Sequence, residues 1–321
     1  MPNKLNEMKE MIKISKSIIM KNIYIISCLL FVLVSNRGYG QKIWGSPLGQ
    51  YAYNAGGGAM NNLSEISSSY YNSFSSANNN PMGYLLMGQA TFPNDRIAAG
   101  FKLTSESGGV LNSTSAEATF IYRVPVAKSS KLSFGLSGVL NQMGIMRDRI
   151  NAQNPDDPLL TSAKAGFWGD ANFGVSLYET NRYYAGFGMN NLMGGQTTWL
   201  VSNFTNRAAR LYSLSGMYTF TVFHGDGKLE FTGVGLSYLT GKTAVNYDLT
   251  SRIIMKKSFW IGTGYTPNAI KVLFGLYFQN FTVGYTGGIG VGDITKFTYK
   301  MPRQEIFVRL EINNSKSSRS K

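Results

Sequence analysis

The chain has 321 residues, with 36 glycines, 13% aromatic residues and 15% charged residues, and its formal net charge is +14. Soluble domains average about 25% charged residues, whereas a transmembrane β-barrel combines an apolar lipid face with aromatic girdles. No basic patch is interleaved with stacking aromatics, so nucleic acid is a poor partner hypothesis. Residues 1–40 contain six basic and two acidic residues, which leaves +10 for the rest. Anionic lipid head groups or an acidic partner surface suit this charge.

The first forty residues contain a three-part export signal. Met20-Lys21 is a short basic start, residues 23–34 are apolar, and Gly38-Tyr39-Gly40 places small residues before Gln41. The apolar run is shorter than the roughly 20 residues that a membrane-spanning helix needs. We therefore expect residues 1–40 to be a signal peptide, with residues 1–19 as a spurious upstream start. A retained N-terminal helical anchor is the alternative.

The mature protein should begin at or near Gln41 and fractionate with the outer membrane. The reason is the short apolar run followed by small residues. N-terminal sequencing of protein extracted from washed outer membranes measures this directly. An intact segment 23–34 in the mature protein, or recovery of the protein from the soluble periplasm, would contradict the prediction.

Cys28 is the only cysteine in the sequence. Residues 25–28 (IISC) loosely resemble a lipoprotein cleavage box, which would make Cys28 the lipid-bearing residue. The apolar run continues for six residues beyond Cys28, however, where a processed lipoprotein turns polar, so cleavage before Gln41 is the better interpretation. A mature chain without cysteine has no disulfide framework and no cysteine-bound metal.

Residues 66–312 show the period-2 alternation of half-buried strands. The segment 41–65 precedes the first strand and is interpreted as an N-terminal periplasmic or plug-like segment. The polar and basic residues 313–321 predict a disordered tail. We predict an all-β fold, an antiparallel transmembrane β-barrel of about 14 strands. The predicted strands are 66–74, 82–92, 96–104, 115–125, 131–142, 169–178, 182–190, 209–223, 228–239, 244–250, 257–265, 270–278, 280–287 and 303–312.

Alternation also predicts which face of each strand meets lipid. In residues 132–140 the face of Leu132, Phe134 and Leu136 is apolar, and the opposite face holds Ser133, Gly135 and Ser137. In residues 230–238 we assign Val234, Leu236 and Tyr238 to the lipid side, opposed by Phe231, Gly233, Gly235 and Ser237. In residues 305–312 the inward face carries Glu305, Arg309 and Glu311.

The connections support a barrel as well. Short turns at 93–95, 179–181 and 224–227 contain Asn, Asp or Gly, and the connections 143–168, 191–208 and 288–302 are long. With the strands numbered as above, all these short turns fall at one end of the barrel and all the long loops at the other. A soluble β-sandwich is the alternative architecture. Inward positions are mostly Ser, Thr, Gly and Asn, which favours a wet lumen over a dense apolar core.

Several segments, in order along the chain, resemble the PorP/SprF family of type IX secretion-system membrane proteins of Bacteroidota outer membranes. They are Asn94–Gly100, Phe120–Val126, Lys131–Gly138, Asp157-Pro158, Phe173–Val175, Tyr183–Gly188 leading to Asn191-Leu192, and Gln304–Val308. The chain is similar to a divergent member, because Gln50–Gly56 lacks the proline of the family's Asn-Pro-Ala-like turn and Ser69–Phe74 replaces its Arg-Asn-Gln-Trp-like first strand.

The sequence offers no catalytic, cofactor-binding or metal site, so we predict no enzyme. A barrel hydrolase needs a histidine beside a serine nucleophile, but the single histidine, His224, lies in a predicted short turn. Asp156-Asp157 lacks the spacing of a calcium loop. Residues 146–149 (MRDR) are interpreted as exposed ion pairs of little energetic value, with a partner-contact patch as the alternative.

The resemblance implies a function. It implies an outer-membrane barrel that serves type IX secretion, or that anchors secreted surface proteins such as gliding adhesins. The implied partners are secretion components, among them a periplasmic peptidoglycan-associated protein, together with a secreted surface protein or adhesin and outer-membrane lipids. A diffusion porin or small-solute channel is the alternative, and it would show concentrated charge on inward strand positions.

Overall fold

A computed structural model describes residues 48–60, 64–73, 80–146, 149–150, 165–198, 205–223, 227–238, 245–255, 258–267, 269–291 and 303–312. All of them belong to one compact unit, residues 40–321. The predicted signal peptide and the predicted tail 313–321 lie outside the described residues. Across the part of the chain that the structure describes, none of the helices has the length and apolar character of a membrane span.

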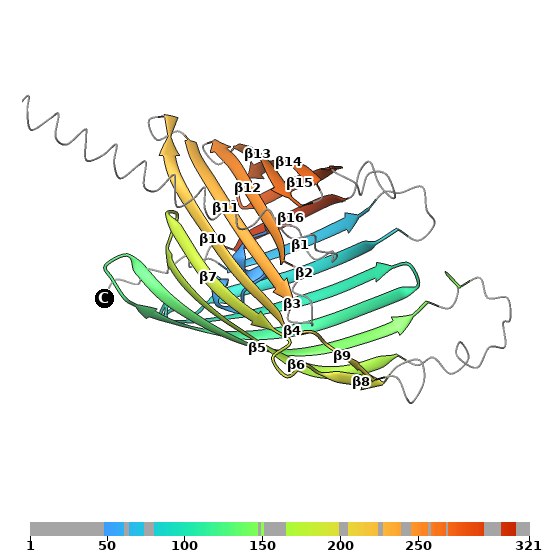
Figure 1. Ribbon diagram of the computed structural model, residues 1–321. Helices are drawn as coiled ribbons and strands as arrows, with labels where there is room; N and C mark the ends of the chain where they lie inside the picture. The colour runs from blue at the N-terminus through green and yellow to red at the C-terminus, as the bar shows by residue number, and fades with distance from the viewer. Residues whose placement is uncertain are drawn as a thin grey trace, which may run out of the picture. The chain divides into compact units, whose positions relative to one another are not determined.

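Fourteen antiparallel strands close into one barrel, in which β1 pairs with both β2 and β16 (Figure 1). This confirms the predicted fold and strand number. Each predicted strand has its counterpart, and the largest differences are strands that run several residues further. The barrel strands are β1 (Ser64–Asn72), β2 (Met82–Thr91), β3 (Ile97–Gly108), β4 (Leu111–Pro125), β5 (Ser130–Ile145), β6 (Gly166–Glu179), β7 (Tyr183–Asn190), β10 (Leu211–Val222), β11 (Gly227–Tyr238), β12 (Val245–Met255), β13 (Phe259–Thr266), β14 (Ala269–Phe278), β15 (Phe281–Gly290) and β16 (Gln304–Ile312).

A second, two-stranded sheet lies between β7 and β10 in the chain. It consists of β8 (Gln196–Thr198) and β9 (Thr205–Arg207). The sequence analysis treated this stretch as a loop, because three-residue strands leave no alternation to detect. The hairpin is part of the long connection 191–210, which therefore carries structure of its own.

The connections alternate between the two ends of the barrel, because every neighbouring pair of strands is antiparallel. The turns 92–96 and 180–182 share one end with the start of β1 and the end of β16. They contain Asp95 and Asn181 at φ values of 56° and 63°, the left-handed conformation that Asp and Asn tolerate best. The long connections 146–165, 191–210 and 291–303 lie at the other end, which we call the outer end because long loops of bacterial barrels are extracellular. The turns and loops named in the sequence analysis therefore separate as predicted, although the two-residue connections 109–110 and 267–268 share the end of the long loops.

The outer face of the barrel is apolar and the inner face is mostly polar. Along β5, Leu136 is 58% exposed on the outside, whereas Ser137 is 1% exposed on the inside. The outward neighbours of Leu136 on the adjacent strands are Phe120 and Phe173. An apolar outer surface of this kind is stable in contact with lipid, whereas in water it would be a very large exposed apolar patch.

The prediction for the two faces of β11 was wrong. Val234 is 3% exposed and packs inside the barrel against Ala52 and Tyr53, whereas Phe231 is exposed on the outside. The physical reason is that part of the lumen is filled by protein, so an inward apolar side chain finds apolar neighbours there. The structure does not describe the side chains of residues 236–238. The predicted lipid contact of Leu236 relied on placing it on the same face as Val234, and Val234 faces the lumen.

The lumen also differs from the wet, weakly charged interior that the sequence predicted. Among the described residues five ion pairs line it, and one of them, Lys271 to Asp248 at 2.5 Å, has a fully buried ammonium group and reaches across β13 from β14 to β12. Charges removed from water are stabilised only when they are paired and hydrogen-bonded, which explains why each of these charges has a partner close by. The other pairs are Lys102–Glu117, Arg252–Glu230, Arg303–Glu305 and Arg309–Glu65.

Candidate functional site

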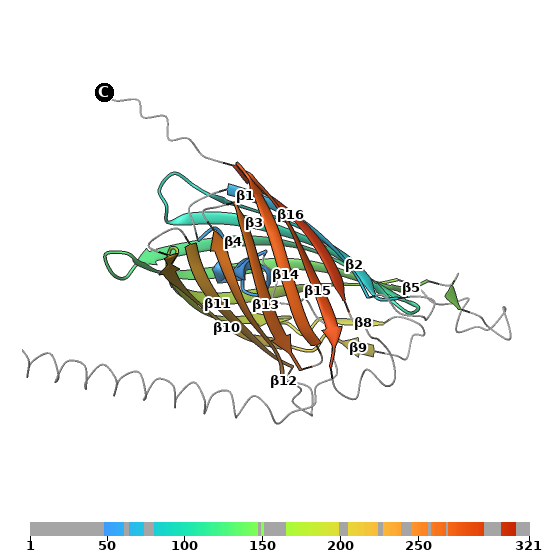
Figure 2. The same ribbon diagram turned by 90° about the horizontal axis from the view of Figure 1, so that it is seen from above.

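Residues 48–60 lie inside the barrel and form a segment that we call the plug (Figure 2). Two short 3₁₀ turns, η1 (Gln50–Ala52) and η2 (Ala55–Gly57), shape it. Gly49 precedes η1 at a φ of 104°, a conformation that residues other than glycine rarely adopt. All residues from 50 to 59 are buried, so the plug is part of the packed interior.

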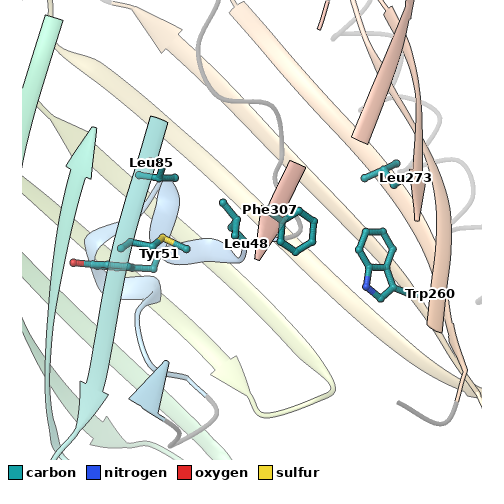
Figure 3. Close-up of a cluster of buried hydrophobic side chains, with 7 residues drawn as sticks. Leu48, Tyr51, Leu85, Trp260, Leu273 and Phe307 are labelled. Carbon is teal, nitrogen blue, oxygen red and sulfur yellow. The ribbon is translucent and has the colours of Figure 1, made fainter. Parts of the chain in front are cut away.

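One end of the plug sits in an apolar cluster. Leu48 and Tyr51 belong to one cluster with Trp260 and Phe307, and Leu48 lies beside Phe307 (Figure 3). The rings of Trp260 and Phe307 stack at a centroid distance of 6.0 Å. Leu85, Met87 and Leu273 complete the cluster. Its members come from β2, β13, β14 and β16, so the plug joins strands from the beginning and the end of the barrel. Burying several large apolar side chains contributes about 1.5–3 kcal/mol for each.

Barrel side chains bind the main-chain carbonyls of the plug. Among the described residues, six side chains donate to six carbonyl groups, and three of these donors, Arg123, Ser176 and Ser213, are each 1% exposed. The bonds are Lys102 Nζ to Ala52 O (3.5 Å), Ser213 Oγ to Tyr53 O (3.3 Å), Ser176 Oγ to Gly56 O (2.6 Å), Arg123 Nη2 to Gly58 O (3.1 Å) and Ala59 O (2.7 Å), Thr91 Oγ1 to Ala59 O (3.4 Å), and Thr180 Oγ1 to Met60 O (3.1 Å).

Asn54 is the polar anchor of the plug. Its side-chain oxygen accepts from the Gly56 N–H at 2.9 Å, and its amide nitrogen donates to Val175 O at 3.0 Å and to Tyr184 Oη at 2.8 Å. The residue is 0% exposed. Leaving such groups unsatisfied would cost about 1–3 kcal/mol each, so Asn54 ties the plug to β6 and β7.

Two glycines of the wall give the plug its seat. A Cβ atom at Gly135 would lie 2.3 Å from the Ala55 carbonyl carbon, and one at Gly174 would lie 1.9 Å from Asn54 Oδ1. Both strands therefore need glycine at these inward positions, because the plug backbone lies directly against the wall backbone. The plug also needs a glycine at residue 56, since a Cβ there would be 2.7 Å from Gly174 O.

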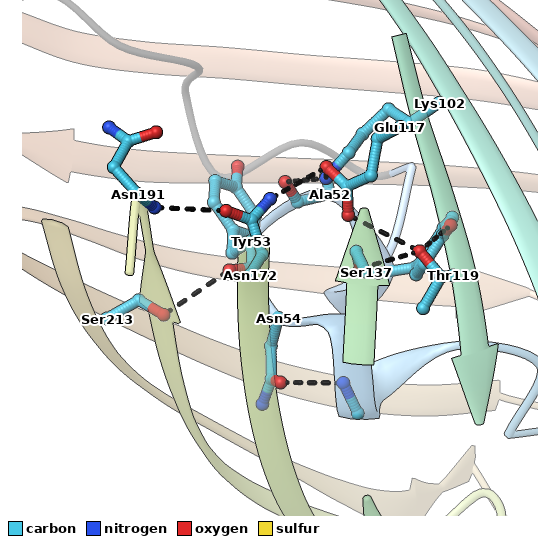
Figure 4. Close-up of polar contacts among 12 residues, drawn as sticks. Ala52, Tyr53, Asn54, Lys102, Glu117, Thr119, Ser137, Asn172, Asn191 and Ser213 are labelled. Atoms are coloured by element: carbon cyan, nitrogen blue, oxygen red, sulfur yellow. Dashed lines mark hydrogen bonds and ion pairs between the residues drawn. The ribbon is translucent and has the colours of Figure 1, made fainter. Parts of the chain in front are cut away.

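A chain of polar contacts runs from the plug to the outer end of the barrel (Figure 4). Lys102, which donates to Ala52 O, forms an ion pair with Glu117 at 3.0 Å. Asn172 Nδ2 donates to Glu117 Oε2 at 3.0 Å, and Asn172 Oδ1 accepts from the Asn191 N–H at 3.0 Å. Asn191 opens the long connection 191–210, so this chain, the polar relay, links the plug to that loop.

Tyr51 and Asp170 extend the polar relay at its two ends. Tyr51 Oη donates to Thr119 Oγ1 at 2.8 Å, and Thr119 hydrogen-bonds Ser137 at 2.8 Å. Burial raises the pKa of Tyr51, so its phenol stays protonated and keeps this bond. At the outer end, the Asp170 carboxylate accepts from the main-chain N–H groups of Met193 at 2.9 Å and Gly195 at 3.0 Å.

Most of the residues that the sequence analysis considered for chemistry, namely His224, Asp156-Asp157 and Arg147-Asp148, lie outside the described residues. Arg149 is described, and it donates to Gly109 O at 3.4 Å at the outer end of the barrel. Among the described residues there is no group of acidic, histidine or cysteine side chains that could hold a metal ion. The sequence analysis interpreted residues 41–65 as a periplasmic or plug-like segment, but it did not single out residues 48–60 within it. It also assigned no role to inward glycines, although glycines at alternate positions of a strand were visible.

The fold and the filled lumen define a class: an outer-membrane β-barrel whose interior is occupied by its own N-terminal segment. Residues 51–310 match the family model described as type IX secretion system membrane protein PorP/SprF. The chain belongs to this family, which confirms the resemblance seen in the sequence. It is a membrane protein of the type IX secretion system, located in the outer membrane.

Comparisons with other proteins add no function. No curated protein matches the chain. Among solved structures, the outer membrane protein Omp33 of Acinetobacter baumannii shares 7% identity at a TM-score of 0.45, covering 78% of this chain and 99% of its own. A Pseudomonas aeruginosa FadL homologue shares 9% at 0.47, covering 86% and 99%. The toluene transporter TodX of Pseudomonas putida shares 8% at 0.42, covering 78% and 88%.

Proposed function

We propose that the protein is a non-enzymatic scaffold that anchors exported surface proteins at the outer membrane. The observation that supports this is the filled lumen: residues 50–59 are buried among wall side chains, which leaves little room for solutes. A barrel that does not conduct can still hold a partner through its outer loops and dock machinery at its short-turn end. The partners proposed are secretion components, among them a periplasmic peptidoglycan-associated protein, and a secreted surface protein or gliding adhesin.

The long loops at the outer end are the proposed partner-holding surface. Connections in compact domains usually run about 4–6 residues, and much longer ones tend to be functional. Here the connections 146–165 and 191–210 are both much longer than that, and β8 and β9 give the second one internal structure. The polar relay joins this second loop to the plug, so a partner bound to the loop would contact a segment whose base is held by hydrogen bonds to the barrel interior.

Deleting residues 147–164 should abolish surface display or secretion of a dependent protein and leave the barrel folded. The strand ends are secured independently, because Met143 pairs with Gly166 across β5 and β6. Heat-dependent migration on a gel checks folding, and surface labelling of the exported protein measures display. Normal display from a folded, loop-deleted barrel would contradict the loop assignment.

A diffusion porin is the competing function, and conductance separates the two. The purified wild-type barrel should show low conductance in planar bilayers, before and after the loop deletion, because the plug and not the loop closes the lumen. High and steady conductance, in combination with normal protein secretion by cells that lack the whole gene, would leave the porin as the surviving interpretation.

A further inference from the structure

The contacts of the plug are those of a bound peptide. Six of its carbonyl groups accept from barrel side chains, and side-chain anchoring is concentrated at Tyr51 and Asn54. A carbonyl group is the same in every residue, so this mode of binding tolerates other sequences. The tight seat on Gly135 and Gly174 adds a size limit: a Cβ at residue 56 would lie 2.7 Å from Gly174 O, and Ala55 is only 3% exposed.

The plug is also not part of the strand ladder that forms the wall. Among the described residues, its hydrogen bonds between main-chain groups are local turns, such as Asn54 N to Gln50 O at 3.0 Å and Gly57 N to Asn54 O at 2.9 Å. The ladder of the barrel runs from β1 through β16 and returns to β1 without a plug residue in it. Withdrawing the plug would therefore leave every strand pairing of the wall in place.

We infer that the lumen is a peptide-binding site, and that the plug occupies it in place of a segment of the exported partner. The ligand class follows from the contacts: an aromatic residue, an asparagine three positions later, and at least two small residues after it, as in Tyr51, Asn54, Ala55 and Gly56. This inference rests on the proposed function as an anchor for exported proteins.

Tethering explains why the site is filled by its own chain. A segment on a short linker has an effective concentration of about 1 mM or more, so a free peptide of modest affinity competes poorly. An exported segment gains the same advantage once its own protein is held at the outer loops. The partner segment would then replace the plug and hold the partner in the barrel. The polar relay would couple the occupant of the lumen to the loop 191–210.

The test uses the full chain with a protease site placed at residues 61–63, between the plug and β1. After purification and cleavage, the barrel is incubated with a fluorescent synthetic peptide of residues 48–60. We expect saturable binding, competition by the unlabelled peptide, and competition about tenfold or more weaker by a Gly56→Val peptide, since overpacking costs about 1–3 kcal/mol. A Met60→Leu peptide is the matched control and should compete like the parent peptide.

Two outcomes would overturn the inference. One is a cleaved, folded barrel that takes up no peptide, which would make the plug a permanent part of the wall. The other is equal competition by the Gly56→Val peptide, which would mean non-specific uptake. A periplasmic carrier fused to residues 48–60 should also reduce display of the dependent protein, whereas the Gly56→Val fusion should not. Unchanged display with the first fusion would overturn the partner assignment.

Failure of the inference is distinguishable from failure of the proposed function. If deleting the gene abolishes display but no peptide exchanges, the anchor function stands and the lumen is only filled. If deleting the gene leaves display unchanged, the anchor function itself fails, whatever the peptide does.

Discussion

Arginine in place of Leu136 should destabilise the inserted barrel by about 2–4 kcal/mol. Leu136 is 58% exposed on the outer face near the middle of β5, between Phe120 and Phe173 on the adjacent strands. A guanidinium group at the bilayer midplane loses its hydration and gains no partner. Urea titration of folding into lipid vesicles measures the free energy of unfolding.

Gln142→Arg is the matched control for Leu136→Arg. Gln142 is exposed on the same face of the same strand, and six residues of strand span about 20 Å. It lies towards the outer interface, where the cost of arginine should fall to about 0–1 kcal/mol. Equal losses at both positions would contradict the placement of this face in the bilayer.

Arginine at Ser137 would not be an inexpensive comparison on the inner face. Ser137 is 1% exposed and hydrogen-bonded to Thr119, next to the plug, so a large side chain there would also be costly. On β11, Gly235 shares the outward face with Phe231, which removes it as a lumen position. Because the lumen is filled by protein, arginine substitutions are expected to be destabilising on the inner face as well as on the outer face.

Valine in place of Gly135 should expel the plug and open the lumen. Its Cβ would lie 2.3 Å from main-chain atoms of Ala55, and no rotamer change relieves a clash between two backbones. Overpacking costs about 1–3 kcal/mol, and the plug is held outside the strand ladder, so the plug and not the wall should move. The expected results are higher conductance in planar bilayers and faster proteolysis within residues 48–60.

Gly138→Val is the control for Gly135→Val. Gly138 lies three residues along the same strand on the opposite face, and a Cβ there meets no atom within 4 Å. Because valine favours extended backbone, this variant should keep low conductance and a protected plug. A Gly135→Val barrel that is folded, closed and protease-resistant would contradict the close seating of the plug.

The strands and their short turns were predictable because a membrane barrel repeats one local rule. In each barrel strand, such as β5 (Ser130–Ile145), residues that face lipid alternate with residues that face the lumen. The positions that face lipid must be apolar. The short turns can be recognised from residues such as Asp95 and Asn181, which tolerate positive φ. These signals are local, so a single sequence carries them.

The lumen was not predictable in the same way, because its contents depend on residues far apart in the chain. Val234 is apolar and inward because Ala52 and Tyr53 lie against it, and alternation alone assigns such a residue to lipid. The inward charges were underestimated for a related reason: Lys271 looks like a solvated residue in the sequence, and only the fold brings Asp248 to it from two strands away. The plug itself has no period, so only its buried contacts distinguish it from a loop.

The plug imposes an order on the folding of the barrel. Leu48 packs with Phe307, 259 positions later, while Tyr51 bonds Thr119 on β4. Its seat is therefore complete only when β1 and β16 have closed the seam, and contacts this distant along the chain form slowly. Until closure, the edges of β1 and β16 present unpaired main-chain groups that recruit other strands. Correct assembly thus requires that the unpaired edges of β1 and β16 do not aggregate before the plug is in place.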